Sequence, residues 1–205
     1  MNSGGNEREG KDNRRESYRE EINMSEATDE RIARDRLSFL RTLRAVRSFR
    51  PDPIPREVVH DLLEVARWSG SASNKQPWEI LLVRERDTLR SLASLEGYAD
   101  HLADAPLGIV LVMAGDRAEQ ETYDEGRLAE RIMLAAHAHG VGSSIGWIVG
   151  PGRNAARELL GIPKEKVVRT AISLGYPAEE PRRSRAGHGQ ARKPLGEIIH
   201  HERYG

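Results

Sequence analysis

The sequence contains no cysteine, so a disulfide framework, a thiolate metal site and a thiol nucleophile are all excluded. It also has no apolar run near the ~20 residues that a membrane-spanning helix needs, and no signal peptide opens it. We therefore expect no membrane span. A reducing cytoplasm is the expected location.

The chain also lacks a surplus of either charge. Its 32 Lys and Arg residues balance 32 Asp and Glu residues, for a formal net charge of +0. Nucleic-acid binders and basic membrane-surface proteins need such a surplus. Neither nucleic acid nor a membrane is therefore an expected partner.

The first 30 residues hold almost nothing that a core could bury. They are polar, charged and glycine-bearing, as in the opening MNSGGNEREGKDNRRESYREE. This composition predicts a disordered charged tail over 1–30. The remaining residues, 31–205, suffice for one ordinary domain with a sizeable core.

Within that domain, helical patterns alternate with short apolar runs typical of buried strands. The spacing of apolar residues predicts helices over 28–43, 55–68, 86–95, 124–139 and 154–160. Strands are predicted over 79–84, 106–114, 144–149 and 167–174, and a short apolar element over 195–199. This alternation indicates a layered α+β or α/β domain.

A polar stretch, SASNKQPW, joins the second helix to the first strand at Ser71–Trp78. A plain connector would need only residues that suit turn geometry. This one offers a hydroxyl, amide donors and amide acceptors in a row, as a site for a flat polar ligand would. We expect Trp78 itself to pack in the core or in an interface.

Hydrolysis and metal chemistry find little support. A serine-hydrolase elbow needs Gly-x-Ser-x-Gly between a strand and a helix, whereas Gly70-Ser71-Ala72-Ser73-Asn74 follows a helix and lacks the second glycine. His137 and His139 are two apart on a predicted helix, so they point to different faces.

A dinucleotide fingerprint is a more serious alternative. The segment 150–155, GPGRNA, matches Gly-x-Gly-x-x-Ala between a predicted strand and helix. The following helix is short, however, and no acidic residue ends the next strand to hold a ribose. A glycine–proline turn is favoured, and a Rossmann dehydrogenase using Gly150 and Gly152 stays open as a rival.

Arginines supply the remaining chemistry. Arg44 and Arg47 are three apart at the end of the first predicted helix, so they would share a face. Arg192 lies near the C-terminus. Forked guanidinium groups suit a phosphomonoester, which carries close to two negative charges.

Six blocks of sequence together resemble the FMN-dependent nitroreductase family, in family order over about residues 36–202. They lie at 44–55, 70–78, 142–150, 160–163, 174–177 and 192–195. The resemblance implies a nitroreductase-like α+β fold, with a central, mostly antiparallel sheet flanked by helices. It also implies a homodimer with FMN at the interface. Leu43 and Ala45 stand where the fuller family pattern has an arginine and a serine.

The resemblance also implies a cofactor site drawn from distant parts of the chain. The phosphate and ribityl end of FMN would be held by Arg44, Ala45, Arg47 and Arg192. The partner subunit would reach the flavin with Gly70, Ser71, Ala72 and Asn74. The backbone at Val149 and Gly150 would face the isoalloxazine edge, with an N–H directed at the reactive nitrogen.

The function implied is an oxidoreductase that uses NAD(P)H to reduce a small organic acceptor, such as a nitroaromatic compound or a quinone, by a ping-pong mechanism. The flavin carries the chemistry, so no catalytic side chain is expected. Other members of the family dehalogenate, oxidise rings, or modify flavin or deazaflavin. Those reactions, and a non-catalytic flavin-binding module, are the alternatives.

Overall fold

The computed structural model describes residues 29–179 and 192–204. An N-terminal helix covers 29–42 and precedes four further helices: α2 (Arg56–Arg67), α3 (Arg86–Ala93), α4 (Ala118–Ala138) and α5 (Gly152–Leu160). The strands are β1 (Trp78–Val83), β2 (Gly97–Tyr98), β3 (Leu107–Met113), β4 (Gly142–Ile148) and β5 (Val167–Gly175). Short 3₁₀ turns are η1 (Ala72–Asn74), η2 (Asp100–Asp104) and η3 (Leu195–Glu197).

The five strands form one sheet in the order β1-β3-β5-β4-β2, and every neighbouring pair is antiparallel. The predicted antiparallel sheet flanked by helices is therefore confirmed. The Rossmann alternative is wrong, because it needs parallel strands around a crossover helix. Here α5 joins β4 to β5, and these strands run antiparallel, with Ser144 opposite Ser173.

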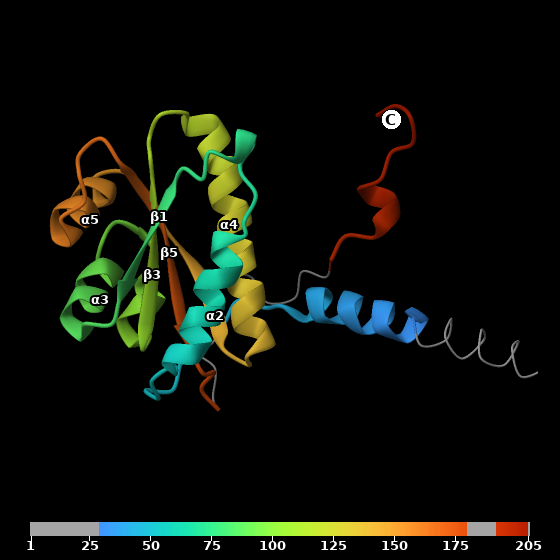
Figure 1. The fold of residues 1–205 in the computed structure, drawn as a ribbon, viewed down its shortest axis with the longest axis horizontal. Helices are drawn as coiled ribbons and strands as arrows, with labels where there is room; N and C mark the ends of the chain where they lie inside the picture. Colours follow the sequence, from blue (N-terminus) through green and yellow to red (C-terminus); the bar gives the residue numbers. More distant parts are fainter. Residues whose placement is uncertain (1–28, 180–191, 205) are drawn as a thin grey trace, which may run out of the picture.

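The sheet lies between two helical layers, as Figure 1 shows, with α2 and α4 on one face and α3 and α5 on the other. On the first face Ile109 packs with Leu62 of α2 and Leu128 of α4. On the second face Val110 packs with Leu89 of α3. Because successive strand residues point to opposite faces, a strand covered on both sides must be apolar throughout. All seven residues of β3 are buried, which explains its unbroken apolar run.

Helix α4 begins at Ala118, earlier than the predicted start at residue 124. Its first turns carry acidic residues, which the apolar pattern did not include. Glu121 is nevertheless buried, because its carboxylate accepts the backbone N–H groups of Gly115 and Arg117 at 2.9 and 3.1 Å. The helix ends as predicted, with Gly140 in the left-handed conformation at φ +67°.

The first helix ends at residue 42, so the prediction that Arg44 and Arg47 share a helical face is wrong. Tertiary pairing explains this end. Ala45 forms a parallel bridge with Ser143, and the N–H of Val46 donates to the Ser143 carbonyl at 2.8 Å. This pairing draws the chain out of the helix and along the sheet. The predicted tail at 1–30 lies outside the described residues, except for 29 and 30, which are helical.

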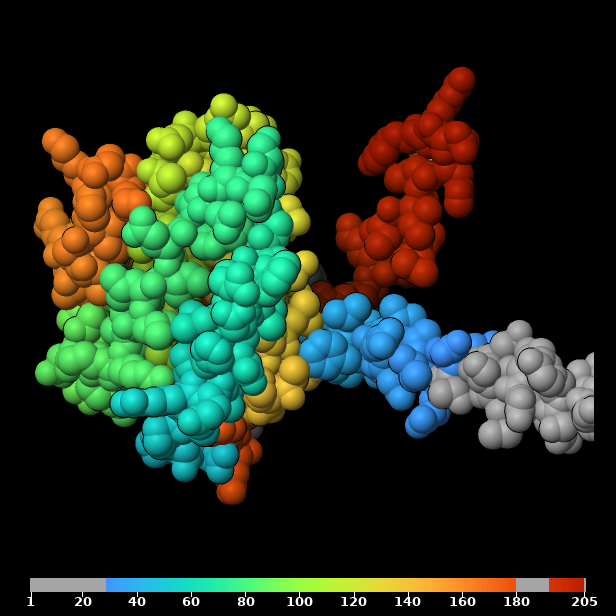
Figure 2. Space-filling model, in the orientation of Figure 1, coloured from blue at the N-terminus to red at the C-terminus, as the bar shows by residue number. Residues whose placement is uncertain are grey.

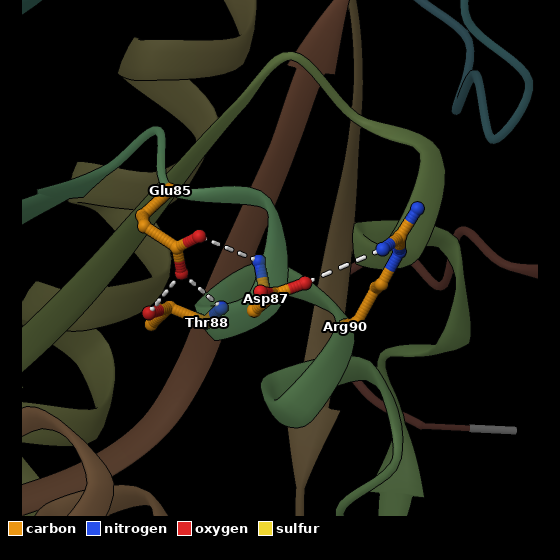
Figure 3. Close-up of polar contacts among 4 residues, drawn as sticks. All are labelled: Glu85, Asp87, Thr88 and Arg90. Atoms are coloured by element: carbon orange, nitrogen blue, oxygen red, sulfur yellow. Dashed lines mark hydrogen bonds and ion pairs between the residues drawn. The ribbon is translucent and has the colours of Figure 1, made fainter.

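Helix α3 is closed at its start by Glu85, as Figure 3 shows. The Glu85 carboxylate accepts the backbone N–H groups of Asp87 and Thr88 at 2.9 and 2.5 Å, and the Thr88 hydroxyl at 2.7 Å. These bonds satisfy donors that a helix start leaves without partners. The Asp87 N–H, with the Thr88 groups, lowers the pKa of the Glu85 carboxyl below its usual value of 4.5.

Replacing Glu85 by Ala should lower the melting temperature by a few degrees at neutral pH, because α3 loses its cap. Since the pKa is lowered on folding, the stabilisation is fully present above the ordinary pKa of 4.5 and is lost as the pH falls through the lower folded value. Melting curves of the wild type and Glu85→Ala should therefore converge in acid. Glu57→Ala, an acidic residue without a cap bond at the start of α2, is the control. Equal melting temperatures of the wild type and Glu85→Ala at pH 7 would show that the Glu85 cap does not stabilise the protein.

Candidate functional site

One edge of β4 carries two separate attachments. The segment around Ala45 bridges Ser143 near the start of the strand, while Ser143 also pairs with Leu174 of β5 on its other side. Strand β2 pairs with the end of β4, where Tyr98 lies opposite Trp147. Both attachments therefore share the edge of β4 that faces away from β5. This edge leads from the arginine segment at the start of β4 to the turn at its end.

The arginine segment presents two cations at the start of β4, where Arg44, Ala45 and Arg47 are all exposed. The Arg44 guanidinium turns back and donates to the carbonyl oxygens of Arg41 and Leu43 at 2.6 and 2.8 Å. The Arg47 charge, by contrast, acts on His101. Burial and then the nearby Arg47 charge lower the pKa of His101, whose ring bonds the Ser173 hydroxyl at 2.7 Å. The exposed Arg47 guanidinium therefore lies close enough to the buried His101 ring to disfavour its protonated form.

The third predicted arginine, Arg192, is exposed and opens the C-terminal segment 192–204. Figure 2 shows this segment standing clear of the sheet and its helices. Residues 180–191, which include the alanine and glutamine just before Arg192, lie outside the described ranges. The meeting of Arg192 with Arg44 and Arg47 stays a prediction.

The loop after α2 is held in an unusual backbone conformation. Ser73, Asn74 and Gln76 all have positive φ, at 52°, 53° and 50°. Non-glycine residues adopt this region at a cost, and such strain persists where the surrounding structure holds it. The Ser71 hydroxyl accepts the Gln76 N–H at 2.8 Å, and the Ala72 N–H donates to the Asp124 carboxylate at 3.2 Å.

These bonds leave part of the predicted donor set free. Ser71 uses its oxygen as an acceptor, so its own proton can still be donated. The Asn74 side chain is exposed and has no hydrogen-bond partner among the described residues. Gly70, by contrast, is in close contact with the Arg127 side chain: a Cβ on Gly70 would lie 2.3 Å from the Arg127 guanidinium.

At the other end of β4, the two backbone N–H groups of the turn at Val149 and Gly150 differ in their hydrogen bonding. The Val149 N–H donates to the Glu96 carbonyl at 3.0 Å. Gly150 has φ +49°, and its N–H has no partner in the part of the chain that the structure describes. The donor that the turn can offer to a ligand is therefore the Gly150 N–H.

Between these ends, β4 exposes two large apolar side chains. Ile145 is 39% and Trp147 is 37% exposed, while Ser144, Gly146 and Ile148 between and beside them are buried. The Arg153 guanidinium lies 5.7 Å from the centre of the Trp147 ring. Sequence reasoning did not single out these two residues. The alternation of polar or small residues with Ile145 and Trp147 was the available signal.

A cavity of about 350 Å³ lies against the polar loop. It is lined by Gln76, Pro77 and Trp78, by the first turns of α4, and by Lys166. Of the ten predicted site residues it contains only Ala72. Trp78 also packs against the α2 and α4 core, as expected. Within residues 29–179 and 192–204, no group of three or more His, Asp or Glu could hold a metal ion, and no helix could cross a membrane.

Comparison with known proteins identifies the fold and the family. The sequence profile of the Nitroreductase family matches residues 40–110 and 88–176. The chain belongs to the nitroreductase family. Among its relatives, a protein of Archaeoglobus fulgidus named as an NADH dehydrogenase/NAD(P)H nitroreductase is 35% identical over 153 residues, which cover 70% of this chain and 86% of that protein. The NADH dehydrogenase of Thermus thermophilus is 27% identical, over 76% of this chain and 90% of its own.

Solved structures of nitroreductases share the fold at lower sequence identity. An FMN-dependent nitroreductase from Clostridium difficile superimposes with a TM-score of 0.71 at 23% identity, covering 82% of this chain and 99% of its own. The NADPH:FMN oxidoreductase of Vibrio harveyi, in complex with NAD⁺, gives a TM-score of 0.65 at 22% identity, over 79% of this chain and 74% of its own.

The nitroreductase fold explains the glycines of the 150–155 segment without a dinucleotide. A Cβ on Gly152 would lie 2.7 Å from the Glu96 carbonyl oxygen and 3.0 Å from the Glu96 nitrogen. Gly152 is buried, and its contact partner is backbone, which cannot move aside easily. The glycine therefore lets the loop before β2 lie directly on the start of α5.

Gly152→Ala should destabilise the nitroreductase fold by about 1–3 kcal/mol, because the added methyl group overpacks the contact with Glu96. Gly126→Ala is a matched control in the middle of α4, where a Cβ would meet nothing within 4 Å. That control should gain about 1 kcal/mol from helix propensity alone. Urea denaturation measures both changes, and an unchanged midpoint for Gly152→Ala would contradict the close contact.

Proposed function

We propose that this nitroreductase is an FMN-dependent enzyme that takes electrons from NAD(P)H and reduces a small organic acceptor, a nitroaromatic compound or a quinone. The arrangement along β4 carries the proposal. Cations lie at its start, apolar side chains are exposed along it, and the N–H of Gly150 at its end has no partner among the described residues. These are the features that an elongated ligand with an anionic tail and a flat polar ring requires.

The donor set suits each part of FMN. Arg47 and Arg44, joined by Arg192, supply forked donors for a phosphate dianion, and Ala45 leaves space between them. Ile145 and Trp147 offer apolar surface to the ring. The Gly150 N–H, next to Val149, can donate to the ring edge, where a fixed donor stabilises negative charge gained on reduction.

FMN, when bound, accepts hydride from NAD(P)H and delivers electrons to the acceptor. The chain's own residues bind the cofactor, fix its orientation and keep one face for the two substrates in turn. The names of several relatives agree with this chemistry, including an NADPH-flavin oxidoreductase of Vibrio harveyi that is 25% identical over 179 residues. Membership of the family does not specify the electron acceptor, so the choice of a nitroaromatic compound or a quinone is the most specific part of this proposal.

The active protein is proposed to be a homodimer. Figure 1 shows the N-terminal helix and the C-terminal segment projecting from the same side of the layered body. Both carry exposed apolar residues: Leu37 at 56%, Leu40 at 53%, Leu195 at 70% and Ile198 at 56%. A second copy of the chain would cover these surfaces. It would also bring Gly70, Ser71, Ala72 and Asn74 to the flavin of the first copy.

Replacing Leu37 and Leu40 together by Glu should weaken the dimer roughly a hundredfold, because two apolar side chains lose their burial against the partner. Sedimentation equilibrium over a range of concentrations measures the dissociation constant. Arg36→Glu, an exposed change on the same helix, is the control. If the wild-type chain sediments as a monomer at micromolar concentration, the proposal that a partner subunit contributes residues to the flavin site is wrong.

The purified protein should be yellow, should bleach anaerobically with NADH or NADPH, and should regain its colour with a quinone or a nitroaromatic compound. Arg47→Ala and Arg192→Ala should each raise the FMN dissociation constant roughly tenfold to a hundredfold, since a charge-assisted bond contributes about 1.5–3 kcal/mol. Arg36→Ala should leave it unchanged. Fluorescence titration of FMN measures the affinity, and unchanged flavin occupancy in Arg192→Ala would refute that assignment.

Other outcomes of the same experiment point to the rival functions. A yellow protein that neither nicotinamide reduces would indicate a flavin-binding module or a member with another reductant. A protein that is reduced but not reoxidised by quinones or nitroaromatic compounds would indicate one of the other family reactions, such as dehalogenation or ring oxidation.

A further inference from the structure

A carboxylate with no assigned role lies against the Gly150 turn. A Cβ built on Gly150 would lie 3.1 Å from Oε2 and 3.3 Å from Oε1 of Glu96. The space that a side chain at position 150 would occupy is therefore filled by this carboxylate. The same residue, Gly150, carries the N–H that is proposed to face the cofactor.

The backbone of Glu96 is fixed in this place from three sides. Its carbonyl accepts the Val149 N–H at 3.0 Å, and Gly152 packs against its carbonyl and nitrogen. Gly97, the next residue, has φ +144° and lies so close to β4 that a Cβ would be 2.1 Å from the Trp147 carbonyl oxygen. Because Gly97, Gly150 and Gly152 have no side chain, this loop can lie directly against the end of β4.

The carboxylate itself is left uncommitted by this arrangement. Glu96 is exposed, and no hydrogen bond or ion pair of its side chain occurs within the described ranges. The charged or titratable groups on neighbouring elements are Arg153, Arg157 and Glu158 of α5, Tyr98 of β2, and Asp100, His101 and Asp104 of η2. Arg153 is directed to the Ile148 carbonyl at 3.0 Å and to the Trp147 ring, and within the described residues none of these groups pairs with Glu96.

We propose that Glu96 is the proton-transfer group of this nitroreductase: it binds a proton when the site gains electrons and gives that proton to the acceptor. The proposal rests on the function proposed above. It gives the Glu96 side chain a role in the reaction itself, whereas the residues proposed to bind FMN only hold and orient the cofactor.

The balance of the reaction requires such a proton. NAD(P)H gives up a hydride, which is two electrons and one proton, and leaves as NAD(P)⁺, so the site gains one negative charge. A carboxylate held beside a new negative charge favours its protonated form, because like charges repel. Glu96 takes the proton from solvent. When a quinone then receives the hydride equivalent, Glu96 returns its proton, and the sum is quinone + NAD(P)H + H⁺ → hydroquinone + NAD(P)⁺.

The position of Glu96 also suits the transfer. The carboxylate is exposed, so water can recharge it between turnovers. It lies against Gly150, in the turn that follows the strand carrying Trp147, and we place the acceptor over the exposed face of that ring. A general acid must stand within hydrogen-bond reach of its acceptor. The glycines at 97, 150 and 152 let the Glu96 loop lie directly against the end of β4, where we place that acceptor.

The test compares the FMN-loaded wild type with Glu96→Gln, which keeps the shape and removes the titrating proton. Proton uptake is followed with a pH-indicator dye during anaerobic photoreduction, from pH 5 to pH 9. We expect the variant to take up fewer protons, by as much as one for each two electrons, over part of this range. Its midpoint potential should vary less steeply with pH there, and its quinone reoxidation should slow roughly a hundredfold or more.

Two further variants make the result decisive. Glu158→Gln removes another exposed carboxylate, on α5, and should match the wild type in every measurement. Glu96→Asp should keep the proton uptake but slow the transfer, because its carboxylate is one methylene further back. FMN affinity and melting temperature confirm that each variant is folded and loaded. Proton uptake that is identical in the wild type and Glu96→Gln at every pH would overturn the proposal, whereas a wild type that binds no FMN would overturn the proposed function itself.

Discussion

The position of α4 depends on buried carboxylates that the sheet and loops must satisfy. Glu125 is 3% exposed and pairs with Arg169 of β5, which is 8% exposed. An unpaired charge at this depth would cost several kcal/mol, and removing one partner of a buried pair costs about 3–5 kcal/mol. Glu121 binds the turn after β3, and Asp124 binds the loop after α2. One face of α4 thus fixes three other segments at once.

This constraint reaches the proposed cofactor site through the loop at 70–76. The Asp124 bond to the Ala72 N–H holds the loop where Ser73, Asn74 and Gln76 can keep positive φ. A strained loop of this kind is stable only when its neighbours determine it. The Ser71 hydroxyl and the Asn74 side chain are therefore presented in a fixed arrangement. A preorganised donor loses less conformational entropy when a ligand binds.

The sequence predicted those elements whose pattern is local and strong, and β3 and α2 lie close to their predicted bounds. It failed where distant contacts decide. The bridge from Ala45 to Ser143 ends the first helix early, and no local pattern reports a partner almost a hundred residues away. Glu96 belongs to no periodic pattern in the sequence, so only its contact with Gly150 in the structure points to its proposed role. The family resemblance predicted a set of cofactor residues, which stays a prediction, and it did not point to the apolar surface of Ile145 and Trp147.

The Gly-x-Gly-x-x-Ala segment shows how one pattern serves two physical needs. In a dinucleotide site, glycines let a pyrophosphate approach the backbone at a helix start. Here the same glycines let another part of the chain approach, because the Glu96 backbone lies 2.7 Å from where a Gly152 Cβ would be. The direction of the next strand separates the two cases. Here β5 returns antiparallel to β4, and the loop before β2 fills the space at the turn and brings the Glu96 carboxylate to the edge of the proposed site.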